Sequence, residues 1–289
     1  MVPAGLPLGA LGVLAFSFSF PATKLAVGGL DPWLVAFGRA AVAAVLAAGV
    51  LRATRAPRPD RGQLPRLAVV GGGVVVGFPL FSSLALTTSG SAHGAVVIAI
   101  LPAATALVAV VRAGERPRRA FWLAAAGGLV VVLAFTLAGA HGALTAADAF
   151  LLIGTAACAV GYAEGGALAR DLGGARTICW ALVLSAPVTV PVTAAAALLE
   201  PPHATAGAWA GFAYVSAVSM FLGFFAWYAG LARGGVARVG QVQLLQPLLT
   251  VAWSALLLGE HVGPGVALVA LLVLACVVVT QRARVRAAP

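Results

Sequence analysis

The stretch GAVVIAILPAATALVAVVRAGERPRRAFWLAAAGGLVVVLA, residues 94–134, contains two long apolar runs joined by a short segment rich in arginine. About 20 residues of helix cross the hydrocarbon core of a bilayer, and each run approaches that length. The runs are rich in Ala, Leu and Val and lack the period-two alternation of a barrel strand. Backbone polar groups in lipid must be paired within each segment, which leaves helices. The stretch therefore predicts two membrane-spanning helices, at 94–113 and 119–138.

Long apolar runs of this kind recur along the whole chain. Of its 289 residues, 62% are hydrophobic and only 9% are charged, whereas soluble proteins carry roughly 25% charged residues. We therefore predict an all-α integral membrane protein. Its ten transmembrane helices are expected at residues 6–27, 33–51, 65–86, 94–113, 119–138, 147–169, 177–199, 208–231, 237–258 and 263–281.

Basic residues are concentrated in every second connection between these helices. The chain has 18 Lys and Arg against 8 Asp and Glu. All the basic residues except Lys24 and Arg39 lie in or beside the connections after the second, fourth, sixth and eighth helices, or in the C-terminal tail. The positive-inside rule places these connections, and with them both termini, in the cytoplasm. Charges spread over short loops, rather than over one face or arm, argue against nucleic-acid binding.

The second half of the chain repeats features of the first at an offset of 145 residues. Without a gap, residues 86–115 then align with residues 231–260. The most informative matches are Pro102 with Pro247, Thr105 with Thr250, and the pair Gly114–Glu115 with Gly259–Glu260. Because each half holds an odd number of helices, the halves should have opposite orientations in the bilayer. We predict two inverted five-helix repeats, residues 1–140 and 141–289, an arrangement typical of secondary transporters.

The opening run LAFSFSFPATKLAVGGLDPWLVAFGRAAVAAVLAAG, residues 14–49, also resembles the start of EamA-type members of the drug/metabolite transporter superfamily. Phe20, Lys24, Pro32 and Arg39 fit places at which those proteins commonly show an aromatic residue, a Lys, a Pro and an Arg. The segment from Pro to Glu, which is present in both halves, resembles a further signature of the family. The resemblance implies a ten-helix transporter of amino acids, drugs, sugars or other metabolites. One departure is that Phe16 and Ser19 lie in the stretch where the family often shows Trp and Asn.

Glu164 is the most prominent ionisable residue inside a predicted helix, where a charge is costly and therefore often functional. It lies beside a face of small residues formed by Gly154, Cys158, Gly161 and Gly165, which favours close helix packing. Glu164 could bind a substrate ammonium group or carry a coupling proton. Alternatively, it could be a buried partner of Lys24 or Arg39, or lie nearer the cytoplasmic end.

Arg39, inside the second predicted helix, could pair with Glu164 or with an anionic group of the substrate, or could extend to the interface. The resemblance to the family favours a structural or gating role for it. Lys24 is more simply explained as an interfacial anchor.

The ninth predicted helix carries Gln241, Gln243 and Gln246 before Pro247. Amides in lipid need partners, so Gln243 and Gln246 should line a cavity or hydrogen-bond to another helix. Pro247 should kink its helix, because proline leaves a carbonyl unpaired one turn earlier. Pro102 is expected to do the same in the fourth helix.

Aromatic residues cluster in the third and eighth predicted helices. Trp227 and Tyr228 could stack on a flat substrate, but membership of an interfacial aromatic belt is the favoured interpretation. Tyr162, Phe78 and Ser82 are further candidates for a substrate site.

No metal site or cofactor site is expected, because the three cysteines lie in apolar runs and the four histidines lack metal-ligand spacing. The leading hypothesis is a secondary transporter in the cell (inner) membrane that exports small metabolites or drugs by alternating access. Its partners would be a small-molecule substrate and the lipid bilayer; the oligomeric state is left open, with a monomer possible. The alternatives are a polytopic enzyme acting on a lipid or lipid-linked substrate, and a membrane scaffold.

Overall fold

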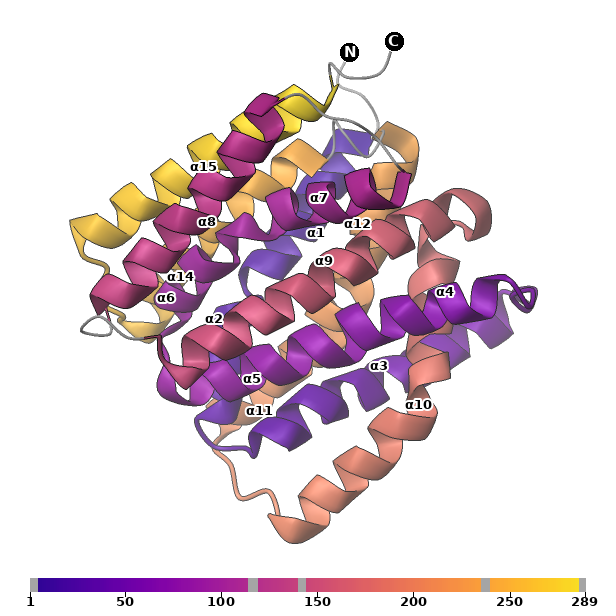
Figure 1. Cartoon of the computed structure of the whole chain (residues 1–289). Coiled ribbons are helices and arrows are strands. Elements are labelled where there is room, and N and C mark those ends of the chain that lie inside the picture. The colour runs from indigo at the N-terminus through magenta and orange to yellow at the C-terminus, as the bar shows by residue number, and fades with distance from the viewer. Residues whose placement is uncertain (1–4, 114–118, 140–143, 235–239, 286–289) are drawn as a thin grey trace.

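The computed structural model describes residues 5–113, 119–139, 144–234 and 240–285, and within these ranges every long apolar segment is helical (Figure 1). The first half contains α1 (Gly5–Ser17), α2 (Ser19–Val27), α3 (Pro32–Ala53), α4 (Gln63–Val70), η1 (Gly71–Gly77), α5 (Phe78–Thr88), α6 (Ser91–Val97), η2 (Ile98–Ile100), α7 (Leu101–Ala113) and α8 (Arg119–Gly139). The second half contains α9 (Ala146–Leu172), α10 (Gly174–Leu199), α11 (Ala206–Ala213), η3 (Tyr214–Leu222), α12 (Gly223–Gly234), η4 (Gly240–Leu245), α14 (Gln246–Leu258) and α15 (Pro264–Val285).

Grouped along the chain, these elements form the ten expected segments. Seven of them are long and apolar enough to cross a membrane, and three shorter apolar helices cover Arg119–Phe135, Val242–Leu258 and Pro264–Val279. The prediction of an all-helical membrane protein is therefore confirmed.

Local sequence signals determine where several of these helices begin and end. Asp31 caps the N-terminus of α3, because its carboxylate accepts a hydrogen bond from the Leu34 amide (2.9 Å). Pro32 follows as the first residue of the helix, a position that proline favours. Thr145 and Asp148 form a reciprocal capping box at the start of α9. Gly259 ends α14 with a φ of 63°, a left-handed conformation that glycine adopts without strain.

Departures from α-helical geometry occur at equivalent places in the two halves. The π-helix η1, shifted by 145 residues, falls on residues 216–222, which lie within the π-helix η3. The 3₁₀ segment η2, shifted in the same way, falls on residues 243–245 within η4. Pro102 and Pro247 each follow one of these 3₁₀ segments. The halves therefore share local backbone geometry as well as sequence, as expected of duplicated units.

Helices of the first half pack mainly on helices of the second (Figure 1). Two of these contacts join counterparts at the offset of 145, α3 with α10 and α8 with α15. The contact of α6 with α14 joins the fourth and ninth membrane segments, which are also related by this offset. The same offset relates α1 to α9 and α5 to α12, so the contact of α1 with α12 and the contact of α5 with α9 are equivalent. The core is thus formed jointly by both halves, and a site at its centre receives residues from each.

Small residues allow a close approach between η1 and α9. A Cβ atom on Gly161 would lie 2.7 Å from Cγ2 of Val74 and 3.1 Å from its backbone nitrogen. The face of small residues predicted beside Glu164 is therefore a contact surface between the two halves.

Candidate functional site

A small cavity lies at the centre of the bundle, lined by both halves. Aromatic rings and polar side chains form most of its wall, namely Phe16, Ser19, Phe20, Arg39, Phe78, Tyr162, Ser219, Phe224 and Gln246. The π-helices η1 and η3 contribute Val74 and Ser219, so the irregular segments of both halves reach it. Its volume of about 30 Å³ is far below the roughly 300 Å³ or more of ligand pockets. As it stands in this structure, the cavity is too small for a drug-sized ligand.

Among the described residues, Arg39 is the one charged side chain in the cavity wall. It is 3% exposed, and its Nη1 donates a long hydrogen bond of 3.4 Å to Oγ1 of Thr23. Its Nε is buried without a partner among the described residues. A guanidinium has five N–H donors, and at least the Nε donor of Arg39 is available to a ligand.

The first membrane segment is interrupted at Phe18, between α1 and α2, next to the cavity. Ser19 and Ser219 hydrogen-bond through their hydroxyl oxygens (2.6 Å). On the other side of Phe18, the Ser17 carbonyl accepts a hydrogen bond from the Thr250 hydroxyl (2.9 Å), and the Ser17 hydroxyl accepts one from the Trp253 indole (3.0 Å). The interruption is thus held by polar contacts with the other half, as is common for broken helices at transporter sites.

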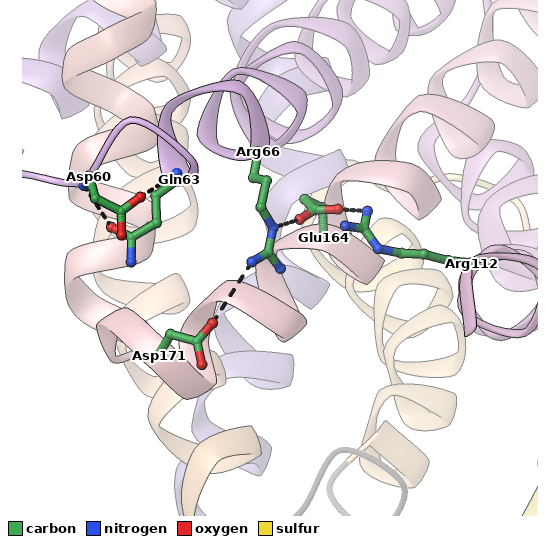
Figure 2. Close-up of polar contacts among 6 residues, drawn as sticks. All are labelled: Asp60, Gln63, Arg66, Arg112, Glu164 and Asp171. Carbon is green, nitrogen blue, oxygen red and sulfur yellow. Dashed lines mark hydrogen bonds and ion pairs between the residues drawn. The ribbon is translucent and has the colours of Figure 1, made fainter.

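An ion-pair cluster joins the two halves at one end of the bundle (Figure 2). Arg66 of α4 and Arg112 of α7 each bind one carboxylate oxygen of Glu164 on α9, and Arg66 also lies 3.8 Å from Asp171. Glu164 is 1% exposed. Two guanidinium groups therefore offset the cost of removing this carboxylate from water. We call this the arginine end of the bundle.

The start of α4 positions Arg66 for this contact. Asp60 and Gln63 exchange two hydrogen bonds, from the Asp60 amide to Oε1 of Gln63 (3.0 Å) and from the Gln63 amide to Oδ1 of Asp60 (2.8 Å) (Figure 2). This pair defines the first turn of the helix, from which Arg66 projects toward α9.

A second set of polar contacts joins the halves at the opposite end. The carboxylate of Glu260, after α14, accepts hydrogen bonds from the amides of Ser91 (2.7 Å) and Ala92 (2.8 Å) and from the Ser91 hydroxyl (2.9 Å). It thereby caps the N-terminus of α6, where the helix dipole favours a negative charge. Glu115, its counterpart at the offset of 145, lies outside the described residues.

We expect Glu260→Ala to destabilise the protein, because it leaves two buried amides at the start of α6 without an acceptor. Hydrogen bonds to charged groups contribute about 1.5–3 kcal/mol, so a loss of about 2 kcal/mol is expected. The measurement is the thermal unfolding temperature of the purified protein in detergent. Glu200→Ala removes an exposed carboxylate after α10 and should change it little. Equal unfolding temperatures for the two variants would contradict the capping role.

Glu164 does not have the partners considered from the sequence. The prediction that it pairs with Lys24 or Arg39 is wrong, because it binds Arg66 and Arg112. Lys24 donates instead to the carbonyls of Leu86 and Ser89 (2.8 Å each) at the end of α5. Eight residues separate Glu164 from the end of α9, about 12 Å along the helix. Because α9 runs three residues past the predicted end at residue 169, this geometry does not favour the alternative of a position nearer the cytoplasmic end.

The interfacial-belt interpretation of Trp227 and Tyr228 is wrong. Both are buried, at 3% and 0% exposure, and belong to the main hydrophobic core. Trp227 contacts the ring of Phe16 and Tyr228 that of Phe224, and neither residue lines the cavity. They support the cavity wall from behind, so stacking directly on a substrate is not favoured in this conformation.

The other candidates divide into wall residues and buried residues beyond the wall. Arg39, Phe78, Tyr162 and Gln246 line the cavity. The Oε1 of Gln246 and the Nε2 of Gln243 are buried without partners among the described residues. Ser82 is buried and donates to the carbonyl of Pro79 (3.2 Å). The side chain of Gln241 lies outside the described part of the chain.

Several wall residues were not proposed from the sequence, chiefly Phe16, Ser19, Ser219, Met220 and Phe224. Phe16 and Ser19 did give a signal, because they lie in the polar and aromatic stretch that resembles other transporters. Ser219 and Met220 lie on the π-helix η3. A π-helix changes which residues of an apolar helix face the interior, and nothing in the sequence of this run indicates that change.

The described residues contain no group of three or more His, Cys, Asp or Glu side chains that could hold a metal ion. His93, in the first turn of α6, is half-buried and pairs with buried Asp148 (2.7 Å). A more open hollow of about 490 Å³ lies between the start of α3 and the end of α10, lined by residues such as Asp31, Trp33, Val192 and Leu199. It is a mostly apolar surface groove without a cationic residue.

Comparisons with known proteins agree with this architecture. A model of the EamA-like transporter family matches twice, over residues 3–137 and 145–281. The uncharacterized transporter YdeK of Bacillus subtilis (strain 168) is 44% identical over 277 residues, covering 95% of this chain and 96% of that protein. One solved structure, described only as the crystal structure of a protein, has a TM-score of 0.65 and 18% identity, with 97% of this chain and 99% of that chain covered. This last likeness shows the fold alone.

Proposed function

Because the chain belongs to the EamA-like transporter family, we propose that it is a secondary carrier that exports small metabolites, such as amino acids, or drugs. Membership makes it a multi-pass transporter of the cell membrane and not an enzyme, so the lipid-modifying alternative is set aside. The substrate, the outward direction and the mechanism of alternating access are proposals.

Inverted repeats, residues 1–140 and 141–289, would give the carrier its two alternative openings. The restriction of basic residues to alternate connections supports opposite orientations of the halves and cytoplasmic termini. The recurrence of π and 3₁₀ segments at the offset of 145 supports their duplication. In this arrangement the arginine end faces the cytoplasm and Glu260 faces outward.

The observation that carries the proposal is a closed cavity at the interface of the repeats, with polar contacts between the halves at both ends. Arg66 and Arg112 hold α9 at the arginine end, and Glu260 holds α6 at the other. Breaking one set while keeping the other would open the cavity to one side of the membrane. Alternating access requires two closures of this kind.

We expect the purified protein in proteoliposomes to catalyse counterflow of at least one member of a panel of amino acids, organic acids and cationic drugs. Counterflow depends on exchange through one carrier and needs no ion gradient, so it tests transport without assuming a coupling ion. Liposomes with the protein unfolded by heating are the control. Absence of counterflow for the whole panel, from protein that elutes as a single folded species, would contradict the proposal.

A further inference from the structure

Within the part of the chain that the structure describes, Arg39 carries the only charge in the wall of the central cavity, and no carboxylate lies within ion-pair distance of it. An uncompensated ion in a buried site costs several kcal/mol. In membrane proteins such residues pair with a partner or mark the path of a substrate. For Arg39 we favour a place on the path of a substrate, because the neighbouring described groups leave its Nε without an acceptor.

Glu164 does not neutralise this charge, although it lies on the same helix as the wall residues Cys158 and Tyr162. Both of its carboxylate oxygens are occupied by Arg66 and Arg112, and it does not line the cavity. The electrostatic potential of the cavity is therefore set by one guanidinium. A cationic substrate would meet repulsion there without any acidic side chain to offset it.

The rest of the wall is suited to an apolar body. Phe16, Phe20, Phe78 and Phe224, with Met220 and Leu101, surround the space next to Arg39. A guanidinium binds carboxylates through two parallel hydrogen bonds. A single cation balances one negative charge, whereas a dianion would leave a net charge in the same apolar surroundings.

Resting on the carrier function proposed above, we propose that the cavity selects organic monocarboxylates with an aromatic or aliphatic body, bound through Arg39. Oε1 of Gln246, which also has no partner among the residues that the structure describes, accepts a hydrogen bond from a hydroxyl or amino group when the substrate has one. Lipophilic cations are excluded by the charge of the site.

Binding of three probes of nearly equal shape tests this proposal: phenylacetate, phenylacetamide and phenethylamine. The readout is the rise in thermal unfolding temperature of the detergent-purified protein with probe concentration, because a ligand that binds the folded state stabilises it. Phenylacetate should bind at least about tenfold more tightly than the neutral amide, a ratio expected of charge-assisted hydrogen bonds. Equal or tighter binding of the amide or the amine would overturn the proposal.

Variants on α3 locate the site. Arg39→Gln should weaken phenylacetate binding about tenfold or more and leave phenylacetamide binding nearly unchanged, and Arg39→Lys should restore part of the loss. Arg52→Gln, an exposed arginine on the same helix, is the matched control and should bind phenylacetate normally. Unchanged phenylacetate binding by Arg39→Gln would overturn the assignment to Arg39. If Arg39→Gln does not fold, the relative affinities of the three probes for the unmodified protein still show whether the site prefers a monocarboxylate.

The outcome is separable from that of the carrier proposal. Counterflow of phenethylamine but not phenylacetate would leave a carrier and overturn the anion site. Tight binding of phenylacetate without counterflow of any compound would uphold the anion site and contradict the carrier.

Discussion

Gly73→Leu is expected to abolish the folded protein, because it places a side chain where two helices of different halves touch through their backbones. A Cβ atom at this position would overlap the carbonyl oxygen of Ala157 and lie 3.0 Å from the backbone nitrogen of Gly161. Overpacking a core costs about 1–3 kcal/mol when side chains can shift, and more when, as here, the obstacle is backbone. The measurement is the monodisperse fraction in size-exclusion chromatography after detergent extraction.

The adjacent residue provides the matched control. Gly72 lies on the same π-helix, is exposed, and has nothing within 4 Å of a Cβ placed on it. Gly72→Leu should therefore elute like the unmodified protein, since it adds an apolar side chain to a surface that faces lipid. If Gly73→Leu were as monodisperse as Gly72→Leu, the close contact of η1 with α9 would not exist in the membrane.

Glu164→Gln is expected to open the cavity toward the arginine end, because it removes the charge that holds Arg66 and Arg112 together. These arginines are 31% and 50% exposed, so each ion pair is assigned only about 1 kcal/mol after screening by solvent. Losing both shifts the equilibrium between closed and open forms by about 30-fold. Cys158, which lines the cavity and is 2% exposed, should then react with a polar maleimide about 30-fold faster.

The reaction is measured in inside-out vesicles with Cys179→Ala and Cys276→Ala in the background. Asp171→Asn is the control, because Asp171 is 61% exposed and lies 3.8 Å from Arg66, at the limit of an ion pair. It should change the rate only slightly. A second background that keeps buried Cys179 instead of Cys158 distinguishes opening of the cavity from general loosening. An unchanged rate for Glu164→Gln would contradict the closure role, as would equal acceleration at Cys179.

The segments of this fold could be predicted from the sequence because hydropathy and loop charge are local properties. Each apolar run becomes a helix, since no other structure pairs its backbone in lipid. The offset that aligns Pro102 with Pro247 also locates the irregular segments before both prolines. The break at Phe18 and the π-helices were not predicted, because they depend on contacts with the other half rather than on propensity.

The site was predicted less completely, for two physical reasons. Glu164 meets Arg66 across a separation of 98 residues. In sequence, an arginine near a helix end that turns inward cannot be distinguished from one that stays in water. Trp227 was assigned to a belt on statistical grounds, yet its burial depends on Gly12, where a Cβ atom would lie 2.9 Å from Cα of Trp227. Arg39, Gln246, Tyr162 and Phe78 were identified because a polar or aromatic residue in an apolar helix stands out by itself.

The lone guanidinium at the centre of the bundle also has an electrical consequence. If the cavity alternates between the two sides of a membrane, the empty carrier moves one positive charge through part of the voltage, whereas a carrier loaded with a monocarboxylate moves none. A full elementary charge corresponds to about 2.3 kcal/mol per 100 mV, or about a 50-fold concentration ratio. In a cell with a negative interior, the outward exit of an anion is downhill, so the membrane voltage alone could drive export without a titrating carboxylate in the site.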